Sequence, residues 1–208
     1  ILGKSRQPMI FVGGGAYDAC EEIKILAETL QAPVVSYQNG RGILDERHHL
    51  AHTNTAGAML WKNCDAAISI GCRMQAERMS WGMDDAIKII HIDIDPTEIN
   101  RIMKPDVGLV SDAAVATKHI INALKKYNIK RPSREEEMLN LKAQAGKLME
   151  EIAGPQMGWL RAIRDVLPDN GLFVDEFTQV GYMSRVGFPV YNPRSMITPG
   201  FQGTLGYG

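Results

Sequence analysis

Short apolar segments without polar alternation recur along the first 125 residues. Five of them predict buried strands, over 8–12, 33–36, 66–70, 88–94 and 107–110. Two intervening stretches, 19–30 and 113–124, carry apolar residues at helical spacing. Unalternating strands interleaved with helices are typical of a parallel sheet covered on both faces. The pattern therefore predicts a doubly wound, Rossmann-like α/β domain of the NAD/FAD-binding type.

The pattern changes after this region. Residues 134–152 are rich in charge but keep an apolar stripe at helical spacing, which predicts a helix that ends at Gly154-Pro155. A second unit then begins, with a predicted helix over 159–167 and a strand over 172–175. Beyond residue 175 we find no regular periodicity.

These patterns divide the chain into a central domain over 1–128, a helical linker over 129–155 and a second α/β domain over 156–208. The chain starts at Ile1 with neither Met nor a signal-peptide pattern. It stops within a glycine-rich loop, 203–208, where a domain boundary seldom falls. We therefore expect both ends to be cut and the second domain to be incomplete.

Composition narrows the class of protein. The net charge of −1 gives no reason to expect a nucleic-acid or anionic-membrane partner. No apolar run approaches the ~20 residues that a membrane-spanning helix needs. The cysteines at 20, 64 and 72 form no CxxC pair. Their spacing favours reduced thiols with a packing role in a cytoplasmic protein.

Three glycines, Gly13-Gly14-Gly15, follow the first predicted strand and precede the first predicted helix. Such a loop would let the backbone approach a diphosphate at the positive end of the helix. It does not complete GxGxxG, because Asp18 stands at the sixth position. Nucleotide binding and a simple tight turn both remain open for this loop.

Charged residues follow two other predicted strands. Asp93 and Asp95 end the strand over 88–94, where a carboxylate can accept hydrogen bonds from a ribose. Asp95 is better explained as the cap of a helix that begins at Pro96, whereas Asp93 stays open. Arg73 follows the strand over 66–70 and could bind phosphate bidentately, although an exposed arginine is usually only solvated.

Three histidines, His48, His49 and His52, invite comparison with a metal site. No carboxylate or cysteine set accompanies them at ligand spacing. We therefore predict surface or turn histidines and no metal site in this chain.

Taken in order, several blocks of the sequence resemble the central domain of thiamine-diphosphate-dependent enzymes. This family includes acetolactate synthase, benzoylformate decarboxylase, pyruvate oxidase and oxalyl-CoA decarboxylase. The resemblance covers about residues 8–125. Its blocks are Phe11–Gly15, Ala32–Val35, Gly40–Gly42, Cys64–Ala66, Gly71–Arg73 and His91–Pro96.

The tail resembles the opening of the family's diphosphate-binding domain. The resemblance implies that the Thr178 hydroxyl reaches the cofactor diphosphate. It also implies that the Gly203 carbonyl and the Leu205 N–H contact the aminopyrimidine, with the Leu205 side chain under the bent cofactor. The cofactor then carries the chemistry and the protein the geometry.

In this family the central domain binds FAD, ADP or nothing. The family's dinucleotide positions correspond here to Gly14, Gly15, Gln38, Arg73, Asp93, Ile94 and Asp112. The sequence departs from the family where a second basic residue would follow Arg73, since Gln75 and Glu77 stand there. A carboxylate at this place is expected to repel a diphosphate.

The resemblance implies a fragment of an acetolactate-synthase-like enzyme that acts on a 2-oxo acid with thiamine diphosphate and Mg²⁺. The family's amino-terminal glutamate and its GDG…N metal motif have no counterpart in these 208 residues. We therefore expect no intact catalytic site, and a homodimer or homotetramer as the parent. Two alternatives stay open, a stand-alone module that binds FAD, ADP or NAD, and a ligand-free structural middle domain.

Overall fold

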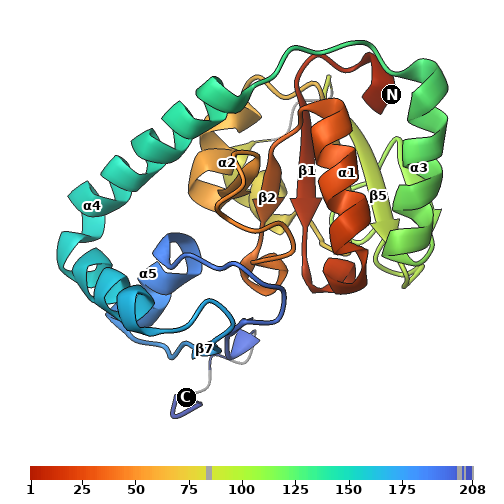
Figure 1. The fold of residues 1–208 in the computed structure, drawn as a ribbon. Coiled ribbons are helices and arrows are strands. Elements are labelled where there is room, and N and C mark those ends of the chain that lie inside the picture. The colour runs from red at the N-terminus through yellow and green to blue at the C-terminus, as the bar shows by residue number, and fades with distance from the viewer. Residues whose placement is uncertain (83–85, 201–202, 204, 208) are drawn as a thin grey trace.

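The computed structural model describes residues 1–82, 86–200, 203 and 205–207 (Figure 1). In this part of the chain six strands form one parallel sheet with the order β3-β2-β1-β4-β5-β6. The strands are β1 (Pro8–Val12), β2 (Val34–Ser36), β3 (Ala51–Thr53), β4 (Ala66–Ile70), β5 (Lys88–Asp93) and β6 (Val107–Val110). The chain winds outward from β1 to β3, returns to β4 beside β1, and winds outward again. The predicted doubly wound fold is confirmed.

Helices cover the sheet and connect its strands (Figure 1). Among the described residues before 130, the α-helices are α1 (Cys20–Leu30), α2 (Asn54–Trp61) and α3 (Ala113–Tyr127). Four short helices accompany them: η1 (Leu2–Lys4), η2 (Gly14–Ala19), η3 (Gln38–Gly40) and the π-helix η4 (Glu77–Trp81). None of the helices in the described residues is long and apolar enough to cross a membrane.

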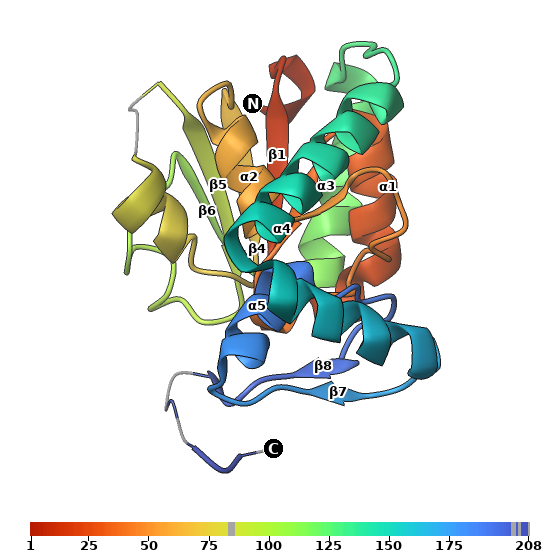
Figure 2. The same cartoon turned by 90° about the vertical axis from the view of Figure 1, so that its left-hand side faces the viewer.

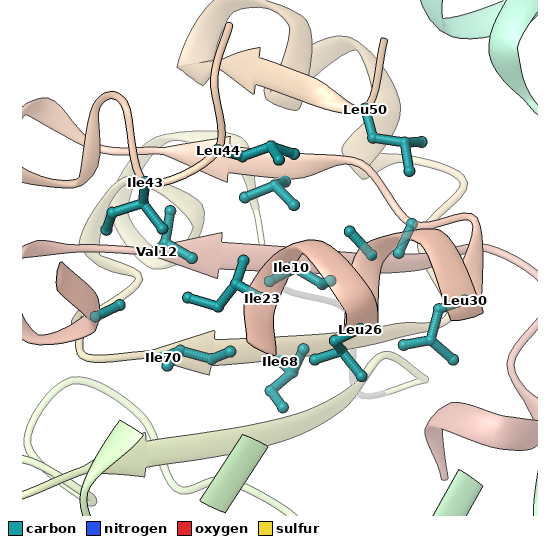
Figure 3. Packing of buried hydrophobic residues seen from close by; sticks show 14 of the residues in the cluster. Ile10, Val12, Ile23, Leu26, Leu30, Ile43, Leu44, Leu50, Ile68 and Ile70 are labelled. Carbon is teal, nitrogen blue, oxygen red and sulfur yellow. The ribbon is translucent and has the colours of Figure 1, made fainter. Parts of the chain in front are cut away.

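The sheet buries both of its faces, as its unalternating strands require. Ile10 and Val12 of β1 pack with Ile23 and Leu26 of α1, together with α3, on one face (Figure 3). Met9 and Phe11 of the same strand belong to a second cluster that contains Trp61 and Trp81. Alternate residues of one apolar strand thus serve two hydrophobic layers.

The strand β3 and the helix α2 were not predicted from the sequence. β3 has three residues, too few for a recognisable pattern, and its central residue is His52. The expectation of surface or turn histidines is wrong for His52, which is 3% exposed. Burial lowers the pKa of His52 to about 3, so that its ring is neutral near neutral pH.

The predicted linker helix is part of a longer helix, α4 (Glu135–Val166), which continues through Gly154-Pro155. Its direction changes at Ala153, whose φ of −146° and ψ of 42° are not helical. The expected break is therefore a kink, which is what a proline inside a helix commonly produces. Met138 in the first half belongs to the sheet core, and Leu160 in the second half belongs to a separate small core.

That small core belongs to the last part of the chain, which lies below the carboxyl ends of the sheet strands (Figure 2). It comprises β7 (Phe173–Val174), α5 (Gln179–Gly187) and β8 (Met196–Ile197), and β7 pairs with β8 in parallel. Regular elements therefore follow residue 175, although the sequence shows no regular periodicity there. α5 is short and contains Gly181, so its pattern is weak, but the Thr178 side chain caps it and α4 packs against it.

Candidate functional site

A cavity of about 930 Å³ opens at the carboxyl edge of the sheet. The segments that follow β1, β2, β4 and β5 all contribute to its lining, as expected where strand order reverses between β1 and β4. Gly13–Gly15, Arg73 and Asp93 all line this cavity, so these candidate residues meet at one edge of the sheet. A volume of this size is typical of a small-molecule site.

The three glycines of the β1 loop have different roles. A Cβ on Gly15 would lie 2.8 Å from Cα of Gly71, so this glycine allows two loops to pack together. The amides of Gly13, Gly15 and Ala16 already donate to backbone carbonyls. A Cβ on Gly14 would lie 3.4 Å from Cβ of Asn39, its nearest neighbour, so this position is less crowded. The close packing of two loops thus explains Gly15, while Gly14 remains a candidate for ligand contact.

The expected position of the loop at a helix N-terminus is wrong. The six-residue 3₁₀-helix η2 separates Gly13 from α1, which begins at Cys20. The positive end of α1 is therefore several residues away from the cavity loop. A phosphate at this loop would depend on local N–H groups and side chains instead.

Arg73 lines the cavity but is already paired. Its Nε lies 2.6 Å from Oε2 of Glu98 and its Nη2 lies 2.9 Å from Oε1. Arg101 binds the same carboxylate. The hydrogen bonds from Arg73 hold the pKa of Glu98 below its usual range. The fork of Arg73 would have to leave Glu98 before it could bind a phosphate bidentately.

Asp93 and Asp95 follow β5 and have separate roles. Asp95 accepts hydrogen bonds from the Thr97 amide and hydroxyl, at 2.8 and 2.7 Å. The segment after it is a turn, so the predicted helix at Pro96 is wrong. Asp95 still accepts a hydrogen bond from a backbone amide two residues on, as a capping residue does, but it stabilises a turn. Asp93 accepts from the Asp95 amide at 3.0 Å and faces the cavity. One of its carboxylate oxygens thus holds the turn, and the group remains a candidate for a ribose.

Glu77 does not face the cavity, and the expected repulsion of a diphosphate is wrong in its mechanism. The side chain is fully buried at the start of the π-helix η4. The Tyr37 hydroxyl, on the cavity wall, donates to Oε2 of Glu77. Burial raises the pKa of Glu77 to about 7, so about half of these side chains are protonated at neutral pH, whereas an ordinary glutamate is fully ionised.

The remaining nucleotide candidates differ in position. Gln38 lines the cavity, whereas Ile94 and Asp112 do not. Asp112 is the N-cap of α3, and its Oδ1 accepts a hydrogen bond from the Val115 amide at 3.0 Å. Ile94 is 70% exposed beside the turn after β5.

The three cofactor candidates in the tail, Gly203, Thr178 and Leu205, also differ in position. Gly203, with a φ of 58°, lines the cavity together with Phe177 and Gly200. The Thr178 hydroxyl oxygen accepts from the Gly181 amide at 3.0 Å and caps α5. The Leu205 side chain is 75% exposed. The last part of the chain therefore completes the wall of the cavity at the sheet edge.

Several cavity residues were not identified from the sequence, namely Tyr37, Asn39, Asn54, Phe177 and Arg185. Tyr37 and Asn39 directly follow β2, so the rule that ligands bind at strand ends could have found them. Asn54 directly follows β3 and was missed because this strand was not predicted, whereas Arg185 lies on α5 and reaches this edge only through the packing of the chain.

No group of three or more histidine, cysteine, aspartate or glutamate side chains is arranged for a metal ion within the described residues. Cys20, Cys64 and Cys72 are free thiols. Burial raises the pKa of Cys64 and of Cys72 to about 12. Both of these thiols are neutral near pH 7 and pack in the core, as expected.

Residues 1–123 match the family model of the thiamine pyrophosphate enzyme central domain. A probable acetolactate synthase large subunit of Methanocaldococcus jannaschii is 29% identical over 228 residues, which cover all of this chain and 38% of that protein. A probable 2-ketoarginine decarboxylase of Pseudomonas aeruginosa is 29% identical, with the same two coverages. An acetolactate synthase of Mycobacterium leprae is 32% identical over 62% of this chain. The chain thus spans less than two fifths of the length of these relatives.

Proposed function

Because this chain belongs to the thiamine pyrophosphate enzyme family through its central domain, we propose that it is part of an enzyme that decarboxylates or joins 2-oxo acids. The printed activities of its relatives, acetolactate synthases and a 2-ketoarginine decarboxylase, support this class of reaction. One structural observation carries the proposal. Gly203, in the loop that resembles the cofactor-seating loop of the family, lies on the wall of the cavity that the central domain opens.

Thiamine diphosphate, with Mg²⁺, is the cofactor of this proposed enzyme. When bound, it supplies a nucleophilic carbon that adds to the carbonyl of a 2-oxo acid. Gly203 and Leu205 would contact its aminopyrimidine, and the exposed Leu205 side chain is available for such a contact. The Thr178 hydroxyl oxygen caps α5 and can still donate its proton to a phosphate oxygen.

The division of the chain belongs to the same proposal. The central domain covers 1–128, the segment over 129–155 connects it to the next unit, and 156–208 begin the diphosphate-binding domain. The separate core around Leu160 and Phe188 supports this second unit. The packing of Met138 on the sheet supports a connection that also covers the central domain.

The central cavity is the site for an adenine nucleotide, FAD or ADP, in this proposal. Gly14 would lie near phosphate and Asp93 near the ribose. Arg73 is held by Glu98, and three amides of the glycine loop are already bonded, so we expect weak binding. A ligand-free structural domain is the alternative that the same two observations favour.

Titration calorimetry of the natural protein with ADP separates these two cases. We expect Asp93→Asn to weaken ADP binding about tenfold, the loss expected when a charge-assisted hydrogen bond is removed. Asp165→Asn, on α4 and outside the cavity lining, is the matched control and should bind as the parent does. No heat with ADP or FAD at millimolar concentration would instead support a ligand-free domain.

Location and assembly are the last parts of the proposal. The free thiols support a reducing compartment, the cytoplasm. A homodimer or homotetramer follows from the family, whose active sites form between two subunits. Light scattering of the natural protein measures the assembly, and a monomer at micromolar concentration would contradict it.

The activity itself is tested on the natural protein that contains this chain. With pyruvate, thiamine diphosphate and Mg²⁺ we expect release of CO₂, together with an aldehyde if the enzyme only decarboxylates, or with a 2-hydroxy ketone or 2-hydroxy acid if it joins two molecules. Omission of thiamine diphosphate should abolish both. The cofactor-saturated protein would contradict the proposal if it consumed no 2-oxo acid from a panel of straight-chain, branched and basic substrates.

A further inference from the structure

A second arginine, Arg185 on α5, also lies on the cavity wall, although it is far from the glycine loop along the sequence. Its side chain is only 11% exposed, whereas that of Arg73 is 41% exposed. Arg185 and Arg73 are the cationic residues in the described lining of the cavity. Since buried charges are costly without partners, the hydrogen bonds of Arg185 need to be accounted for.

The guanidinium of Arg185 is incompletely paired. Its Nε lies 2.8 Å from Oδ2 of Asp175, which is buried under it. Nη2 is buried and has no hydrogen-bond partner within the described part of the chain. Oδ1 of Asp175 is likewise buried without a partner there. A single hydrogen bond thus joins Arg185 to Asp175, and the N–H groups of its terminal nitrogens have no acceptor among the described residues.

Aromatic rings fix the plane of this guanidinium. The central carbon of Arg185 lies 4.6 Å from the ring centre of Phe177 and 5.1 Å from that of Tyr182. Such cation–π contacts orient a guanidinium without using its N–H donors. The fork of Arg185 is therefore held in place for an acceptor that the protein does not supply.

The backbone of Arg185 is also held from the central domain. Arg41, buried in the loop after β2, donates from Nη1 to the Arg185 carbonyl at 2.6 Å and from Nη2 to the Phe188 carbonyl. Glu46 binds the same guanidinium and accepts from the Val190 amide at 3.0 Å. Two central-domain side chains therefore set the position of the end of α5, and with it that of Arg185.

From these contacts we infer that Arg185 binds an oxyanion of the cavity ligand, a carboxylate or a phosphate, through its terminal guanidinium nitrogens. Arg73 is the weaker candidate because both arms of its fork already bind Glu98. The inference rests on the proposed function for the cavity as a ligand site. It adds that the anionic end of the ligand lies against α5, and that Arg41 acts as a positioning residue.

The test measures binding to the natural protein by calorimetry, with pyruvate, inorganic phosphate and pyrophosphate as anionic probes and pyruvamide as an uncharged one. Arg185→Gln is expected to weaken the binding of whichever anionic probe the parent binds by about tenfold or more. This is the range for the loss of a charge-assisted hydrogen bond. The anion affinity of Arg185→Lys should lie between those of the parent and of Arg185→Gln, because lysine keeps the charge but lacks the two-pronged guanidinium. Pyruvamide binding should not change. Preference for pyruvate identifies a substrate carboxylate, and preference for pyrophosphate a cofactor diphosphate.

Two controls keep the result interpretable. Arg161→Gln removes an exposed arginine of α4 that lies outside the cavity lining, and it should bind every probe as the parent does. Arg185→Gln combined with Asp175→Asn removes both buried charges, so loss of anion binding in this folded protein cannot come from an unpaired Asp175. Unchanged anion binding in that double variant, or equal loss of pyruvamide, would overturn the inference. The proposed activity fails separately, through absent turnover with parent protein whose anion binding still depends on Arg185.

Discussion

Glu77→Gln is expected to remove about 3 kcal/mol of the pH dependence of stability between pH 4.5 and pH 8. Burial raises the pKa of Glu77 to about 7 in the folded protein, against an ordinary value of 4.5. The folded state therefore holds the proton more tightly than the unfolded state does. The stability from this group is complete below pH 4.5 and is lost as the pH rises through 7, at about 1.4 kcal/mol for each unit of difference.

The environment of Glu77 explains why ionisation is unfavourable. Tyr37 donates to one carboxylate oxygen, and the other oxygen is buried with no hydrogen-bond partner in the described residues. Glutamine keeps an acceptor for Tyr37 and carries no charge at any pH. The variant should therefore be about as stable as the parent at pH 5 and more stable at pH 8.

Urea unfolding of both proteins at several pH values from 5 to 8 measures this effect. The two proteins must be compared at each pH, because the lowered pKa of His52 contributes a pH dependence of opposite sign below about pH 6.5. Glu151→Gln, an exposed residue of α4, is the control and should follow the parent. Parallel curves for Glu77→Gln and its parent would mean that Glu77 is solvated in the folded state.

Arg41→Met should lower the free energy of unfolding by about 3 to 5 kcal/mol, the cost of breaking a buried ion pair from one side. The Arg41 side chain is 1% exposed, and Glu46 beneath it is 11% exposed. Methionine fills much of the volume but leaves Glu46 without its cation. It also removes the Arg41 donors to the carbonyls of Arg185 and Phe188, while the Ser184 carbonyl keeps its hydrogen bond from the Phe188 amide.

A nearby arginine gives the matched control. Arg47 joins the same two parts of the chain through Asp169, but its side chain is 58% exposed. Arg47→Met should lower the free energy of unfolding far less than Arg41→Met does, because exposed ion pairs contribute little to stability. Arg41→Met combined with Glu46→Gln should recover part of the loss, because no charge is then buried alone. Denaturant unfolding decides the matter, and equal costs for Arg41→Met and Arg47→Met would contradict the buried-pair explanation.

Local pattern was sufficient for most of the sheet and for the place of the site. The strands β1, β4 and β5 are continuous apolar runs, and a run of this kind can be buried on both faces only inside a covered parallel sheet. Parallel strands present their carboxyl ends at one edge, so Gly14, Arg73 and Asp93 could be placed together without a structure. The ordered series of blocks was also enough to identify the family.

Elements whose stability comes from distant contacts escaped the sequence. β3 has three residues and pairs with β2, so its pattern is too short to read. α5 depends on its cap and on α4 rather than on its own propensity. The kink at Ala153 replaced a predicted break because the second half of α4 finds its own core around Leu160. Tertiary packing overrides local preference in all three cases.

The charges of the site were decided by the tertiary structure alone. The sequence places Arg73, Glu77 and Asp112 in order but says nothing about their partners. In the folded chain Arg73 binds Glu98 from the turn after β5, Glu77 is buried under Tyr37, and Asp112 caps α3. Arg185, from another part of the chain, reaches the cavity on a helix that Arg41 holds in place. Sequence patterns record which face of an element is apolar, whereas charge, protonation and pairing depend on burial and distance between segments that are remote in the chain.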